Sequence, residues 1–130
     1  MKRFDQVAPW PSKVNYVDAN NVVLGFDMER SCCEDFGHAV VGSLEEAKEV
    51  SEGRGDAIPW DITAYSFIQE APANLYDTYA HGEAHAAKAF RIIAPNKPDL
   101  FVIIWNHHNG YYSHGFTFEG PGVVAISGGI

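Results

Sequence analysis

Basic residues and long apolar runs are scarce in this chain. Lysine and arginine together number 9 against 17 aspartates and glutamates, so the formal net charge is −8 over 130 residues. Such a surface repels phosphate backbones, and we expect no general binding to duplex nucleic acid. No stretch reaches the roughly 18 apolar residues of a membrane-spanning helix. The opening residues, MKRFDQVAPW, contain no apolar run either, so we expect neither a secretory segment nor a membrane partner.

Cysteine is also scarce, and the two cysteines present, Cys32 and Cys33, are adjacent. Neighbouring cysteines rarely bridge each other, because disulfide geometry needs a Cα separation that they reach only under strain. Reduced thiols and a cytoplasmic location are therefore expected. Structural zinc usually binds pairs such as CxxC or HxxxH, a spacing that these cysteines and His38 do not have. Whether the two thiols are structural or reactive stays open.

Sequence signatures of the common enzyme classes are absent. The chain has no phosphate-binding loop, no GxSxG, no HExxH and no pair of carboxylates arranged for acid–base catalysis. We therefore predict a protein that is not an enzyme and that carries no cofactor and no metal. A metal-dependent enzyme that uses Cys32, Cys33 and histidines is the less favoured alternative.

Alternating apolar residues and turn-forming residues predict one domain, residues 1–130, built mostly of strands. Residues 1–12 are expected to be a lead-in, and Ser127–Ile130 a flexible end. In Glu83–Ile93 the alanines favour a helix and the last residues favour a strand; we predict a strand and keep the helix open. The segments predicted as strands are Lys13–Asp18, Val22–Met28, His38–Val41, Ile62–Ile68, Leu75–Ala80, Glu83–Ile93, the two arms of Phe101–Phe118, and Val123–Ile126.

One helix is clear. The segment Ser43–Val50 begins with an N-cap serine and carries Glu46 at the capping-box position. A shorter helical turn is expected where Ser31 and Glu34 have the same spacing, with Gly37 at its end. The predicted fold class is therefore α+β, a mostly antiparallel sheet with one clear helix in a single compact domain.

The segment Phe101–Phe118, FVIIWNHHNGYYSHGFTF, is the most distinctive part of the chain. Asn109 and Gly110 lie between two apolar runs and predict a hairpin, because both residues tolerate the positive φ of tight turns. Alternation along the second arm places Tyr112 and His114 on one face together with two phenylalanines. Aromatic rings and imidazoles are thus expected to gather at one hairpin.

Aromatic and hydrogen-bonding side chains of this hairpin predict a ligand site. Aromatic rings stack on nucleotide bases, histidine and asparagine hydrogen-bond to them, and an arginine meets phosphate. The plainer interpretation, in which the aromatic residues form the core and the histidines cover an exposed turn, stays open. The candidate ligand-binding residues are Trp105, Asn106, His108, Tyr111, Tyr112, His114 and Arg91.

Two motifs together resemble a family of small phage and bacterial proteins of unknown function. Asp27–Glu34 reads DMERSCCE and Trp105–Ser113 reads WNHHNGYYS. Members of that family have a strand, an acidic segment ending in Cys-Cys-Glu, and later an aromatic strand entering Asn-Gly-Tyr-Tyr-Ser. The resemblance covers about half of the chain, Val14–Glu34 and Phe90–Phe118, and it departs in Phe36–Gly53, where the family has an Asp-rich loop. It supplies no catalytic residues.

More loosely, the chain resembles phage proteins that sequester nucleotide signals, such as the Thoeris anti-defence sponges. That resemblance implies a non-enzymatic phage or prophage accessory protein in the host cytoplasm, forming a homo-oligomer that binds a small nucleotide-type signalling ligand. The alternative is an acidic inhibitor, similar to anti-CRISPR proteins, that binds a host immune protein by mimicking nucleic acid.

Overall fold

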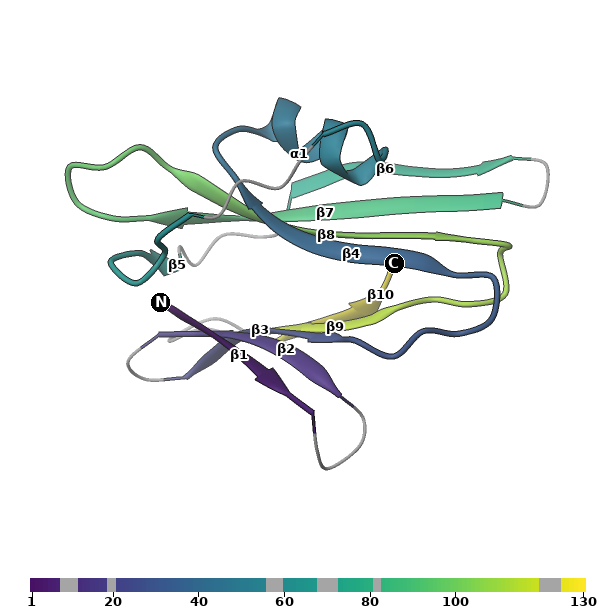
Figure 1. Cartoon of the computed structure of the whole chain (residues 1–130), viewed down its shortest axis with the longest axis horizontal. Helices are drawn as coiled ribbons and strands as arrows, with labels where there is room; N and C mark the ends of the chain where they lie inside the picture. The colour runs from purple at the N-terminus through teal and green to yellow at the C-terminus, as the bar shows by residue number, and fades with distance from the viewer. Residues whose placement is uncertain (8–11, 19–20, 56–59, 68–72, 81–82, 120–124) are drawn as a thin grey trace.

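A computed structural model describes residues 1–7, 12–18, 21–55, 60–67, 73–80, 83–119 and 125–130 of the chain. These residues form two antiparallel sheets that lie face to face, with a single helix, α1, on the outer side of one sheet (Figure 1). The predicted α+β class, mostly antiparallel strand with one helix, is confirmed. Within the described ranges, no helix has the length and apolarity needed to cross a membrane.

The first sheet, called sheet 1, holds the two ends of the described chain. Its strands are arranged in the order β1-β2-β3-β9-β10, and every neighbouring pair is antiparallel. The bounds of these strands are β1 (Lys2–Gln6), β2 (Lys13–Val17), β3 (Val22–Asp27), β9 (Gly115–Phe118) and β10 (Ile126–Gly129).

The second sheet, called sheet 2, is built around the two longest strands. Its order is β4-β8-β7-β5, and β6 pairs with another part of β7. All of these pairs are antiparallel. The bounds of the strands are β4 (Asp35–Val41), β5 (Ser66–Phe67), β6 (Ala73–Ala80), β7 (Glu83–Ile93) and β8 (Leu100–His108).

The main hydrophobic core fills the space between the two sheets. Buried residues alternate with less buried ones along β2 and β9, as the period of two residues requires. Phe90 of sheet 2 stacks on Phe118 of sheet 1 with ring centroids 5.0 Å apart, and burial of each such side chain stabilises the fold by roughly 1.5–3 kcal/mol. Core residues from the two sheets are Val14, Tyr16, Leu24, Phe26, Phe90, Ile92, Leu100, Val102, Ile104, Phe116 and Phe118.

Helix α1 (Leu44–Ser51) covers the outer face of sheet 2 (Figure 1). Ser43 is its N-cap, and the Ser43 hydroxyl accepts the Glu46 N–H at 3.1 Å. The Glu46 carboxylate reaches back to the N–H of Gly42 at 2.7 Å, so the predicted capping arrangement is present with its return bond one residue earlier. A second, smaller apolar cluster lies under the helix and contains Ala39, Val41, Ala47, Val50, Ala87 and Ile103.

Most of the predicted strands are confirmed, including the contested Glu83–Ile93, which is strand β7 over its whole length. Two predictions at the ends of the chain are wrong. The expected lead-in contains β1, and the expected flexible end contains β10 and the buried Ile130. Glycines make β10 look unstructured, yet strand pairing needs only main-chain N–H and C=O groups. The final strand was predicted from Val123, but residues 120–124 lie outside the described residues.

The hairpin predicted over Phe101–Phe118 is also wrong, because β8 belongs to sheet 2 and β9 to sheet 1. Gly110 does have a positive φ of 87°, as the Asn-Gly turn requires. The two arms do not pair with each other because β8 lies between β4 and β7, and β9 lies between β3 and β10. Residues 109–114 therefore carry the chain from one layer to the other.

The helical turn predicted after Ser31 is replaced by a tight turn at Cys32 and Cys33, and β4 begins at Asp35. Glu34 nevertheless accepts the Ser31 N–H at 2.7 Å, the bond that the capping-box spacing predicted. Gly37, expected to end a helix, lies inside β4 opposite Trp105. The indole ring of Trp105 lies directly over Gly37, which explains the glycine.

Replacing Gly37 with alanine is expected to destabilise the protein. A Cβ atom there would come within 2.1 Å of the Trp105 ring, and such overpacking typically costs about 1–3 kcal/mol. Gly25→Ala is the matched control, because its nearest neighbour would be the mobile Asn15 amide oxygen at 3.2 Å. Urea unfolding followed by tryptophan fluorescence measures both changes. Equal stability of the two variants would contradict this packing.

His38 makes the stability of the protein depend on pH. It lies between the sheets with the rings of Tyr16 and Phe26 at 6.3 and 6.2 Å, and burial lowers its pKa from 6.5 to about 4. The unfolded chain therefore takes up this proton near pH 6.5 and the folded chain only near pH 4. Stability is expected to fall by at most about 3 kcal/mol between those values as the pH is lowered.

The measurement compares wild type with His38→Gln in urea unfolding at a series of pH values. Carboxylates titrate in both proteins, so the difference between the two curves isolates the histidine. The difference should be flat above pH 6.5 and should change steadily down to pH 4. Parallel curves over the whole range would show that His38 is not held neutral by its surroundings.

Candidate functional site

The Cys-Cys-Glu segment contacts the residue that directly follows the Asn-Gly-Tyr-Tyr-Ser segment, through Glu34 and His114. These side chains are 1% and 3% exposed, and His114 Nδ1 lies 2.6 Å from Glu34 Oε1. The other ring nitrogen of His114, Nε2, is hydrogen-bonded to the main-chain carbonyl of Asp27. The second carboxylate oxygen of Glu34 accepts the Ser31 N–H. Each polar group of this buried pair thus has a partner.

Both ring nitrogens of His114 have hydrogen-bond partners. Nδ1 faces the carboxyl group of Glu34, and Nε2 faces the main-chain carbonyl of Asp27, which only accepts hydrogen bonds. The two bonds therefore need one proton on Nε2 and one proton shared between Nδ1 and the Glu34 carboxyl group. Glu34 and His114 thus form a buried hydrogen-bonded pair that has no net charge.

Asn106 holds the same region from the other side. Its amide Nδ2 donates to the main-chain oxygen of Ile130 at 2.8 Å and to that of Tyr112 at 3.3 Å. Ile130 and His114 also exchange two main-chain hydrogen bonds, at 2.8 and 3.0 Å. Asn106 is fully buried, so its donors connect the chain segments inside the fold.

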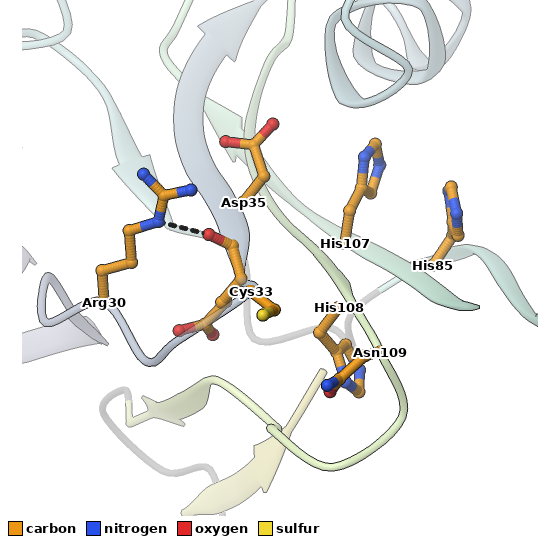
Figure 2. A pocket seen from close by; sticks show the side chains of 8 residues that line it. Arg30, Cys33, Asp35, His85, His107, His108 and Asn109 are labelled. Carbon is orange, nitrogen blue, oxygen red and sulfur yellow. Dashed lines mark hydrogen bonds between the residues drawn. The ribbon is translucent and has the colours of Figure 1, made fainter. Parts of the chain in front are cut away.

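A pocket of about 480 Å³ opens beside this pair, at the end of sheet 2 (Figure 2). Two of its walls are the segments that connect the sheets, and the third is the end of β4, β7 and β8. Figure 2 shows basic and imidazole side chains on several sides of this space. The lining residues are Arg30, Cys33, Glu34, Asp35, His85, His107, His108 and Asn109.

Strand register brings Asp35, His107 and His85 into one row across β4, β8 and β7. Directly paired residues of an antiparallel sheet lie on the same face. The two imidazole rings have centroids 4.3 Å apart and are tilted by 31°. This face also carries helix α1, and the main chain of Ser51 at the end of that helix is hydrogen-bonded to the His107 ring.

His107 is held toward its neutral form. Burial lowers the pKa of His107, and the neighbouring His85 lowers it further. Asp35 and the hydrogen bond to the Ser51 main chain act in the opposite direction and are the smaller effects. Near neutral pH, His107 therefore presents a hydrogen-bonding imidazole to the pocket, with little fixed charge.

Arg30 and His108 have defined orientations at the pocket. The Arg30 Nε–H donates to the main-chain carbonyl of Glu34, which fixes the position of the guanidinium (Figure 2). The Gly110 N–H donates to His108 Nδ1 at 3.1 Å, so in neutral His108 the proton is on Nε2. Both residues thus bring hydrogen-bond donors to the same pocket.

Of the seven candidate ligand-binding residues named from the sequence, His108 lines this pocket. Asn106 and His114 lie in the interior and hydrogen-bond within the protein. Tyr111 is 87% exposed and Tyr112 is half-buried.

The remaining two candidates lie on other parts of sheet 2. Trp105 covers Gly37 on the face that carries α1. Arg91 is bound to Asp99 at 2.7 Å, at the opposite end of β7 from the pocket. Ligand binding by any of the seven stays a prediction.

Sequence reasoning missed the other pocket residues, among them Arg30, Asp35, His85 and His107. His85 and His107 become neighbours only through the pairing of β7 with β8. Once Glu83–Ile93 is taken as a strand, its antiparallel pairing through the short connection before Leu100 would bring these histidines together. Within the described part of the chain, no group of three or more His, Cys, Asp and Glu side chains is arranged to hold a metal ion.

Comparison of the chain with protein-family models, curated proteins and solved structures gave no match. The resemblance carried by the two motifs therefore stays a prediction. The description of the pocket and of the buried pair rests on their geometry alone.

Removing the carboxyl group of Glu34 is expected to destabilise the protein. Glu34→Ala leaves His114 Nδ1 and the Ser31 N–H without their hydrogen-bond partner, and each buried polar group left unsatisfied typically costs about 1–3 kcal/mol. The control is Asp99→Ala, which removes an ion pair at the surface with Arg91 and should cost less than about 1 kcal/mol. Urea unfolding measures both. A loss below that of the control would contradict a buried, hydrogen-bonded pair.

Proposed function

We propose that this protein is a non-enzymatic phage or prophage accessory protein that binds and sequesters a small nucleotide-type ligand. One observation carries the proposal: Arg30 and the three histidines His85, His107 and His108 line one pocket in a chain of net charge −8. Donors gathered in this way provide a local site for an anionic group despite the acidic surface. The phage setting and the sequestering role rest on the resemblance of the two motifs.

In this proposal, the phosphate of the ligand binds Arg30. A guanidinium has five N–H donors, and the bond from Arg30 Nε to the Glu34 carbonyl uses one of them while orienting the group. Arginine forks of this kind suit phosphate oxygens. The imidazoles of His107 and His108 supply further hydrogen bonds, which do not require them to be charged.

In the same proposal, the nucleotide base stacks on the loop that follows β8. Tyr111 lies two residues after Asn109 of the pocket, and its ring is 87% exposed. The Asn109 side-chain oxygen accepts the Tyr111 N–H at 3.2 Å, which links the aromatic residue to the pocket rim. An exposed aromatic ring stacks on any base, and such contacts are worth about 1–3 kcal/mol per base.

Calorimetric titration with a panel of cyclic and linear adenine nucleotides tests the proposal. At least one should bind to wild type, and Arg30→Gln should weaken binding roughly tenfold to a hundredfold, since hydrogen bonds to charged groups contribute about 1.5–3 kcal/mol. Arg3→Gln is the matched control and should leave binding unchanged, because Arg3 lies on the edge strand β1 of the other sheet, where it pairs with Asp5. A flat response of folded wild-type protein across the panel would overturn the proposal.

One observation favours the alternative, an acidic inhibitor of a host immune protein. Strand β1 is at the edge of sheet 1 and all of its residues are exposed, including Phe4 at 55%. An exposed edge with an apolar side chain can accept a strand from another chain, either a host protein or a second copy. Failure of the nucleotide panel, together with a stoichiometric host partner whose binding is lost in Phe4→Lys, would favour this function.

A further inference from the structure

Cys32 and Cys33 form a tight turn on the surface, and their sulfur atoms are in contact. The two Sγ atoms lie 3.3 Å apart, and both residues are exposed. Cys33 has a φ of 61°, in the left-handed region that non-glycine residues rarely adopt. The turn therefore directs both thiols to the same place although the residues are adjacent.

The turn is held in this shape by groups outside the two cysteines. Glu34 accepts the Ser31 N–H through its carboxylate and the Arg30 Nε–H through its carbonyl, which joins the two sides of the turn. Glu34 is itself bound to the buried His114. Because these bonds fix the main chain on both sides, bringing the sulfur atoms together loses little additional conformational freedom.

We propose that Cys32 and Cys33 are a reversible dithiol–disulfide site, oxidised by a small disulfide such as glutathione disulfide. The site does not depend on the nucleotide proposed above. Both cysteines are free in the structure, as expected, and the proposal goes further because the turn has brought their two sulfur atoms into contact.

The reaction proceeds in two exchange steps. The thiolate of one cysteine attacks one sulfur of glutathione disulfide, forms a mixed disulfide and releases the first glutathione thiolate. The other cysteine then loses its proton, attacks the protein sulfur of the mixed disulfide and releases the second glutathione thiolate. The protein loses two protons and two electrons, and one glutathione disulfide becomes two glutathione molecules.

The two thiols share one hydrogen bond, and either sulfur atom can be its donor. Only the thiolate is an effective nucleophile in disulfide exchange. The cysteine that first loses its proton therefore attacks, and its neighbour completes the bridge.

Reversibility follows from the adjacency of the residues. Neighbouring Cα atoms are about 3.8 Å apart across a trans peptide, whereas most disulfides join Cα atoms about 4.4–6.8 Å apart. A bridge in so small a ring is strained, and strained, exposed disulfides are the readily reduced ones. The site is thus suited to sensing the thiol–disulfide balance of its surroundings, and a permanent structural role does not fit it.

Intact-mass spectrometry on the reduced full chain tests the proposal. After incubation with glutathione disulfide and quenching with N-ethylmaleimide, wild type should be a monomer two hydrogen atoms lighter, with neither cysteine alkylated. Dithiothreitol should restore two alkylatable thiols. Cys33→Ser should stop at the glutathione adduct on Cys32, and Cys32→Ser should stop at the adduct on Cys33.

Three results would overturn the proposal: wild type that stops at a glutathione adduct, wild type that forms a disulfide-linked dimer, or wild type that stays alkylated on both cysteines. Both cysteines are exposed, so the serine variants are expected to fold. Circular dichroism shows whether the variants are folded before their oxidation is measured by mass spectrometry. The measurement uses no nucleotide, so its outcome is independent of the ligand titration.

Discussion

The buried contact between Glu34 and His114 joins the two places where the chain passes between the layers of the sandwich. Residues 28–34 lead from β3 in sheet 1 to β4 in sheet 2, and residues 109–114 lead from β8 in sheet 2 back to β9 in sheet 1. Burying two ionisable groups is a poor source of net stability, because desolvation offsets much of their attraction. The effect here is on geometry: the pair fixes one connection against the other through hydrogen bonds to both ring nitrogens of His114.

The pocket forms between these two connections. Arg30 and Cys33 come from the first connection, His108 and Asn109 border the second, and the end of sheet 2 closes the space between them (Figure 2). The two motifs that carry the family resemblance therefore contain residues of two kinds. Buried residues such as Glu34 and Asn106 hold the chain segments together through hydrogen bonds, while exposed residues of the same motifs remain available for chemistry. A motif can thus resemble a binding signature although some of its residues only stabilise the fold.

Local patterns predicted local structure well in this chain. The N-cap at Ser43 and the strand over Glu83–Ile93 depend on neighbouring residues, and both are present. The prediction of a hairpin over Phe101–Phe118 was wrong because Asn-Gly specifies how the chain turns but does not specify the partner of each strand. That partner depends on which sheet edges other strands occupy, which is a property of the whole fold. The glycine-rich Ser127–Ile130 was missed for a related reason, since its pairing uses main-chain groups that carry no sequence signal.

The candidate site was harder to predict than the fold because its geometry depends on burial and register. Glu34 looks like a surface carboxylate in the sequence, and nothing near it in the chain indicates a buried histidine partner 80 residues away. Cys33, by contrast, is surrounded by its determinants: Arg30 and Glu34 hold the turn that aims its sulfur at the sulfur of Cys32. Because Arg30 and Cys33 share this turn and line the pocket together, the bonds that position the guanidinium also position the thiol on the pocket wall.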